Sequence, residues 1–124
     1  MTEDELQTLL EKTLPAADRH GLFVEECQDQ DIRLRFSPPA GGDWSMAALL
    51  ALVDIALRAA SGVTAEISHL NVTVLKPAQT ADVVSLSRVI RRDGDRLHAE
   101  AWLFSHAAVD PVLHATASLA IGPG

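Results

Sequence analysis

The sequence predicts an α+β protein in which a curved antiparallel sheet of about six strands wraps around one long central helix. Two observations carry this prediction. Apolar residues recur at helical spacing in two segments of the first half, whereas later segments alternate apolar and polar residues as strands do. The longer helical segment is apolar on nearly all sides, so it needs a cover, and one apolar face of a curved sheet supplies it.

A short amphipathic helix is predicted at about residues 2–14, because Thr2 and Glu5 have capping-box spacing. Its apolar face would consist of Leu6, Leu9, Leu10 and Leu14. Two strands are predicted at about 22–28 and 32–36, joined by a polar turn at 29–31. A break at Pro15 separates the helix from this hairpin.

The central helix is predicted at about residues 44–61. The Pro- and Gly-rich run from Ser37 to Asp43 is a loop, Asp43 or Ser45 can cap the helix, and Gly62 can end it. Four strands follow, at about 64–76, 82–90, 97–104 and 112–121, with a hairpin turn at Asp93-Gly94. Trp102 and Phe104 would point away from the core. Two aromatic residues exposed on a sheet indicate an interface between subunits.

The bulk properties indicate one globular domain over residues 1–124, with 48% hydrophobic and 22% charged residues. A net charge of −7 argues against nucleic acid as a partner, because such proteins carry a basic face. The acidic N-terminus is unlike a signal peptide, and the longest apolar run, 46–53, is too short to span a membrane. One cysteine, Cys27, gives no intramolecular disulfide. We therefore expect a cytoplasmic protein.

Four segments occur in an order and spacing that resemble a known family. They are Ala47–Ala56, Val63-Thr64, Leu75–Ala78 and Arg91–Leu97. On these segments the chain from about Gly21 to Ile121 resembles the PaaI-like (phenylacetate-pathway) acyl-CoA thioesterases, which have the hotdog fold. The family's His-Gly-Gly motif at the helix entrance is missing, because Ser45, Met46 and Ala47 occupy its positions.

The resemblance implies an acyl-CoA thioesterase that acts as a homodimer or homotetramer, with the site between subunits and with no metal or cofactor. Asp54 takes the position of the catalytic carboxylate, as nucleophile or general base. The amides near Met46 and Ala47 would stabilise the oxyanion. Thr64 takes a position that is often polar and close to the partner's site. The acyl chain would lie along Leu49, Leu50 and Val53.

Each of these residues also has a structural interpretation. Asp54 can form a salt bridge with Arg58 one helical turn later. Ser45 can donate a hydrogen bond where the family has histidine, or it can simply cap the helix. Thr64 is also a good strand residue. Arg91 and Arg92 can bind the phosphates of coenzyme A or belong to a solvated turn. Two alternative functions therefore stay open: a non-catalytic module that binds acyl-CoA, and a purely structural oligomer.

Overall fold

The computed structural model describes residues 2–14, 21–28, 31–38, 44–78, 81–105 and 111–121. The helices among these residues are α1 (Glu3–Thr13) and α3 (Met46–Ser61). The strands are β1 (Phe23–Gln28), β2 (Asp31–Phe36), β3 (Glu66–Val74), β4 (Val83–Asp93), β5 (Arg96–Ser105) and β6 (Pro111–Ala120). The predicted break at Pro15, the turn residues 29–30 and the loop residues 39–43 lie outside the described residues.

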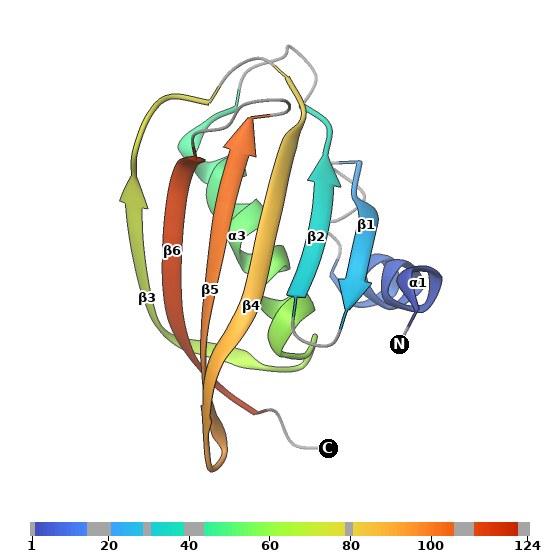
Figure 1. Cartoon of the computed structure of the whole chain (residues 1–124), viewed down its shortest axis with the longest axis vertical. Coiled ribbons are helices and arrows are strands. Elements are labelled where there is room, and N and C mark those ends of the chain that lie inside the picture. Colours follow the sequence, from blue (N-terminus) through green and yellow to red (C-terminus); the bar gives the residue numbers. More distant parts are fainter. Residues whose placement is uncertain are drawn as a thin grey trace.

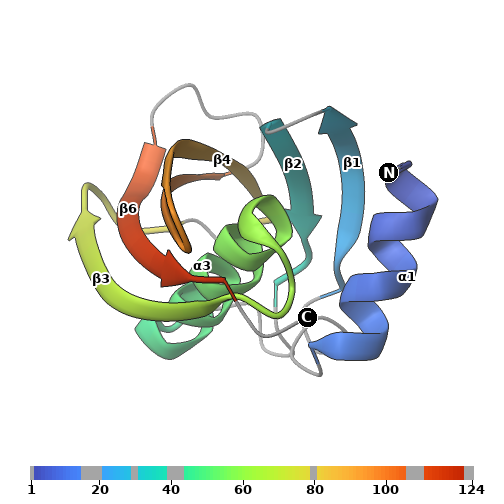
Figure 2. The same ribbon diagram turned by 90° about the horizontal axis from the view of Figure 1, so that it is seen from below.

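The strands form one antiparallel sheet in the order β1-β2-β4-β5-β6-β3 (Figure 1). Figure 2 shows the sheet curving around α3, with α1 beside β1. The predicted α+β hotdog architecture is therefore confirmed. Strand alternation creates the core, because one side chain in two points toward α3. On β5 these inward residues are Leu97, Ala99, Ala101 and Leu103, and all are buried.

The helix boundaries match the prediction closely. The hydroxyl of Thr2 accepts a hydrogen bond from the Glu5 amide at 3.2 Å, and the Glu5 carboxylate accepts one from the Thr2 amide, which completes the capping box. Ser45 is the N-cap of α3, and its hydroxyl accepts from the Ala48 amide at 3.1 Å. Gly62 ends α3 with a φ of 121°, a backbone conformation that L side chains rarely adopt.

Three expectations need correction. Val63 and Thr64 do not open β3, because they form a turn in which the Ala65 amide donates to the Gly62 carbonyl at 3.0 Å. The hairpin turn lies at Gly94-Asp95, one residue later than predicted, since Asp93 still pairs with Arg96. Finally, α3 is not covered on all sides: Met46 is 47% exposed and Leu50 is 38% exposed.

The two edges of the sheet differ. At the β1 edge, the Gln7 side chain donates to the Leu22 carbonyl at 2.8 Å and accepts from the Val24 amide at 2.7 Å. A side-chain amide from α1 thus takes the place of a neighbouring strand. At the other edge, β3 pairs on one side with β6. Its Leu70 and Val74 are 40% and 51% exposed, which is the profile of an uncovered edge strand.

Candidate active site

The N-terminus of α3 offers unused backbone donors. The first amides of a helix have no partner within it, and Ser45 satisfies the one on Ala48. The amides of Met46 and Ala47 therefore remain as candidate oxyanion donors, and both residues are exposed. The capping role predicted for Ser45 is confirmed by this hydrogen bond.

Asp54 lies in the middle of α3 and forms the predicted ion pair with Arg58. Nε of Arg58 donates to Oδ1 of Asp54 at 2.7 Å, and the Asp54 side chain is 43% exposed. No hydrogen bond reaches Oδ2 from any described residue. One carboxylate oxygen is therefore held in place while the other stays available to a substrate or a water molecule.

The surroundings of Asp54 are apolar. Asp54 belongs to a stripe of α3 that the sheet does not cover, formed with Met46, Ala47, Leu50, Ala51 and Arg58. The expected acyl-chain surface needs correction here, because Leu49 is 6% exposed and Val53 is fully buried in the core. Leu50 alone of the three residues remains on the surface, one turn before Asp54.

The candidate donors and Asp54 do not meet within one chain. Asp54 follows Ala47 by seven residues, which at 1.5 Å per residue is a separation of about 10 Å along the helix axis. A nucleophile and an oxyanion donor must both lie about 3 Å from the reacting group. Thr64 is further away still, because it follows the opposite end of this helix of about 24 Å. A single chain therefore does not bring the groups of the predicted site together.

The two arginines proposed for phosphate binding point in different directions. The register places Arg91 opposite His98 and Arg92 opposite Leu97, so their side chains lie on opposite faces of the hairpin. Arg91 is paired with Asp93 at 2.9 Å, and both side chains are about two-thirds exposed. This pair fits the solvated-turn interpretation for Arg91. Arg92 has no ion pair with any described residue.

The outward face of the sheet holds a side-chain network that the sequence analysis did not identify. Glu100 accepts a hydrogen bond from Nε of Arg88 at 2.8 Å, and its other carboxylate oxygen is hydrogen-bonded to Nε2 of His114 at 3.1 Å. The His114 ring stacks on Trp102 with centroids 3.8 Å apart. Burial alone raises the pKa of Glu100, but the hydrogen bonds and charges of His114 and Arg88 outweigh burial and lower that pKa overall. Strand alternation predicts that these residues face outward, but it does not identify their cross-strand neighbours.

The described part of the chain has neither a metal-binding cluster nor a membrane-spanning helix. No three of its His, Cys, Asp and Glu side chains gather closely enough to bind a metal ion. Neither described helix has the length and apolar character that crossing a bilayer requires.

No protein-family model matches this sequence, and no curated protein matches it either. Solved structures do match. A candidate thioesterase from Silicibacter has a TM-score of 0.87 at 18% identity, over 99% of this chain and 93% of that one. Thioesterase superfamily member 2 from Mus musculus has a TM-score of 0.79 at 11% identity, over 97% and 94%.

A third match has the name of the predicted group. The PaaI protein of the E. coli phenylacetic acid degradation operon has a TM-score of 0.78 at 11% identity, over 94% of this chain and 95% of that one. Matches at identities this low establish a shared fold. The chemistry of this chain depends on its own residues. The chain thus has the fold of the thioesterase-superfamily and PaaI hotdog proteins.

Proposed function

We propose that the protein hydrolyses an acyl thioester of coenzyme A, with Asp54 as nucleophile or general base. The observation that carries the proposal is the Asp54 carboxylate, which has one oxygen fixed by Arg58 and one available within an apolar surface stripe. Water adds to the thioester carbonyl and the carbon–sulfur bond breaks, which releases a carboxylate and a thiol. The structural likeness to thioesterase-superfamily proteins supports this reaction class.

The active unit is a symmetric dimer, because Asp54 and the candidate oxyanion amides of one chain lie too far apart to act on the same thioester. In a two-fold pair with antiparallel α3 helices, Asp54 of one subunit comes to the amides of Met46 and Ala47 in its partner. The positive end of the helix dipole lies at the same N-terminus as these amides, and it stabilises the negative charge that develops on the oxyanion. Each dimer then has two equivalent sites.

The surfaces of the chain support such a dimer. The open edge of β3 and the uncovered stripe of α3 both expose apolar side chains, Leu70 and Val74 on the strand and Met46 and Leu50 on the helix. The β1 edge, in contrast, is closed by Gln7. A second copy that covers β3 and α3 together would remove both exposed surfaces from water. Pairs of dimers would then give the homotetramer.

The same residues also support a second candidate function, an acyl-CoA-binding module without hydrolysis. Arg58 occupies one oxygen of Asp54, and Met46 brings a side chain to a position where the related enzymes have glycine. In that case the dimer would hold the thioester without cleaving it. Arg92 is the remaining candidate for contact with a coenzyme A phosphate.

Thiol release from short-chain, long-chain and aryl acyl-CoA substrates tests the proposal. We expect hydrolysis by the wild type and a loss of about 100-fold or more in Asp54→Asn, which keeps the side-chain shape but removes the carboxylate. Asp95→Asn, a matched change in the exposed turn Gly94-Asp95, should leave the rate unchanged. Full activity in Asp54→Asn contradicts the mechanism. Calorimetric binding of coenzyme A without any hydrolysis supports the binding module instead.

A further inference from the structure

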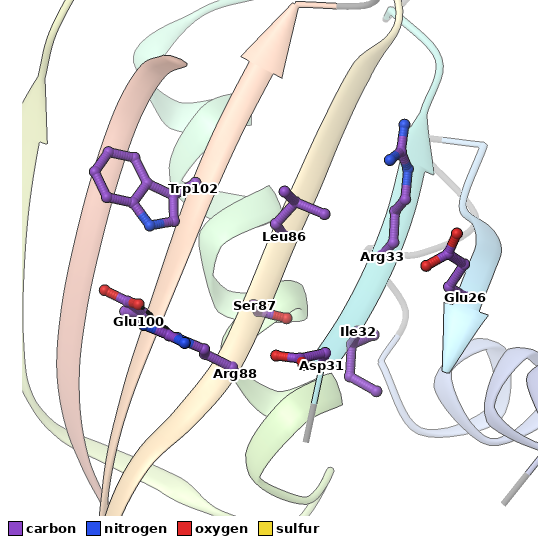
Figure 3. A pocket seen from close by; sticks show the side chains of 9 residues that line it. All are labelled: Glu26, Asp31, Ile32, Arg33, Leu86, Ser87, Arg88, Glu100 and Trp102. Carbon is purple, nitrogen blue, oxygen red and sulfur yellow. Dashed lines mark hydrogen bonds and ion pairs between the residues drawn. The ribbon is translucent and has the colours of Figure 1, made fainter. Parts of the chain in front are cut away.

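A hollow of about 270 Å³ lies on the outward face of the sheet, on the side opposite to α3 (Figure 3). None of the residues predicted for the thioesterase site lines it. The lining comes from β1, β2, β4 and β5 and consists of Glu26, Asp31, Ile32, Arg33, Leu86, Ser87, Arg88, Glu100 and Trp102. Figure 3 shows Leu86 in the middle, between Trp102 on one side and Arg33 on the other.

One wall of the hollow is held in place before any ligand arrives. Trp102 stacks on His114 at an interplanar angle of 27°. His114 is fixed in turn by Glu100, and Glu100 is fixed by Arg88. An indole with a fixed orientation is a ready surface for a flat apolar group or a cation.

Within the described residues, two carboxylates of the hollow, Asp31 and Glu26, have no ionic partner. Asp31 lies across from Arg88 in the sheet, but Arg88 pairs with Glu100 on its other side. Glu26 lies across from Arg33 in the same way, but Arg33 pairs with Glu25, the residue at the β1 bulge. Neither Asp31 nor Glu26 forms an ion pair with any described residue.

These observations define one class of ligand. Leu86 is 39% exposed and, with the Trp102 ring, offers an apolar surface. The lining has three carboxylates and two arginines, which leaves an excess of negative charge beside Asp31 and Glu26. We propose that the hollow binds an organic ammonium ion carried on a small aromatic body. The ring would lie against Trp102 and Leu86, and the ammonium group would supply Asp31 and Glu26 with the ionic contact that Arg88 and Arg33 make with other carboxylates. This site is separate from Asp54 and does not depend on thioester hydrolysis.

Calorimetry with 2-phenylethylamine, at a pH where the amine is charged, tests the inference. We expect a Kd of about 1 mM or tighter for the wild type, with binding at least about tenfold weaker for the neutral isostere 2-phenylethanol. The double variant Glu26→Gln/Asp31→Asn should lose at least about tenfold in affinity for the amine and none for the alcohol. Asp95→Asn, which removes one exposed carboxylate elsewhere, is the matched control.

Three results would overturn the inference. The first is no binding of the amine at about 10 mM, which is ten times the expected Kd. The second is equal affinity for the amine and the alcohol. The third is a loss of affinity for the amine in the Asp95→Asn control that equals the loss in the double variant. Sedimentation of the wild type and of Leu86→Glu adds a further check. If the amine does not bind and Leu86→Glu reduces the size of the assembly, the hollow is instead a contact between copies of the chain.

Discussion

Nε of Arg58 donates to Oδ1 of Asp54 at 2.7 Å, one turn along the same helix. These are the only two charged residues among the sixteen of α3, and the other fourteen are apolar except for Ser61. Both are only half-exposed, at 43% for Asp54 and 29% for Arg58. In the proposed dimer the pair would lie at the subunit contact, where unpaired charge is costly. We infer that Arg58 positions the carboxylate of Asp54 for its reaction.

Arg58→Gln should therefore affect activity more than stability. An i,i+4 ion pair that is partly exposed contributes only about 0.3–0.5 kcal/mol to folding, so urea unfolding should change little. The loss of one fixed oxygen should lower kcat on the order of tenfold, with KM nearly unchanged, because Asp54 is no longer oriented. Arg58→Lys, which keeps the charge without the guanidinium geometry, should retain an intermediate rate. A faster Arg58→Gln enzyme would show that Arg58 restrains Asp54 rather than positioning it.

Gln7→Ala should destabilise the fold by about 1–3 kcal/mol. The change leaves the Leu22 carbonyl and the Val24 amide without their partner at the part-buried β1 edge, and unmade backbone hydrogen bonds have that cost. The free energy of urea unfolding measures the effect. Thr8→Ala, at the exposed neighbouring position of α1, should change it by less than about 0.5 kcal/mol. Equal stability of the two variants would show that water replaces Gln7 at no cost.

Leu50 should lie close to the two-fold axis of the dimer. In the antiparallel arrangement that brings Asp54 to the partner's Met46 and Ala47 amides, position 50 is midway between the interacting groups. Leu50→Cys in a Cys27→Ser background should thus form a disulfide between subunits on oxidation, because the two Cα atoms come within disulfide range. Lys12→Cys, exposed on α1, is the matched control and should stay reduced. Crosslinking of the control alone would rule out this packing.

Glu100 should make the stability of the protein depend on acid pH. Its folded pKa lies below the ordinary value of 4.5, because the hydrogen bonds and charges of His114 and Arg88 outweigh the effect of burial. The stabilisation is therefore present above about pH 4.5 and is lost as pH falls through the lower folded value. Glu100→Gln should cost about 1 kcal/mol at pH 7 and progressively less toward pH 3, by urea unfolding. Glu66→Gln, an exposed β3 carboxylate, should show no such pH-dependent difference.

The sequence predicted the fold well because local periodicity determines most of it. The caps of α3 depend on nearby residue types, so Ser45 was one of two predicted N-caps and Gly62 was the predicted end of the helix. The exposed stripe of α3 could not be predicted, since the pattern shows that Leu50 is apolar but not how far the sheet extends around the helix. Its exposure is visible only once β3 has been placed at the sheet edge.

The contacts that could not be predicted from the sequence join segments that lie far apart in the chain. Glu100 and His114 are fourteen residues apart and meet because β5 and β6 pair as they do. Gln7 and Val24, seventeen residues apart, meet only because α1 packs beside β1. The Asp54–Arg58 pair was predictable for the opposite reason, because a helix turn alone brings the two side chains together.

A mixture of two inactive variants should recover activity if the site is shared between subunits. Met46→Pro removes one candidate oxyanion amide at little structural cost, because proline is favoured at the first position of a helix. Ser45 before it already has an extended backbone, with φ −74° and ψ 162°, as a residue preceding proline requires. Asp54→Asn removes the carboxylate. Each variant alone should therefore be slow for a different reason.

In a mixed dimer, Asp54 of the Met46→Pro subunit meets the intact amides of the Asp54→Asn subunit, so one site of two is complete. After unfolding and refolding of an equimolar mixture, half of the dimers are mixed, and about a quarter of the wild-type rate should return. The control is the double variant that carries both changes in one chain. Unfolded and refolded alone in the same way, it should stay inactive. If the mixture is no faster than the average of its two components, Asp54 and the amides act within one chain or do not act together at all.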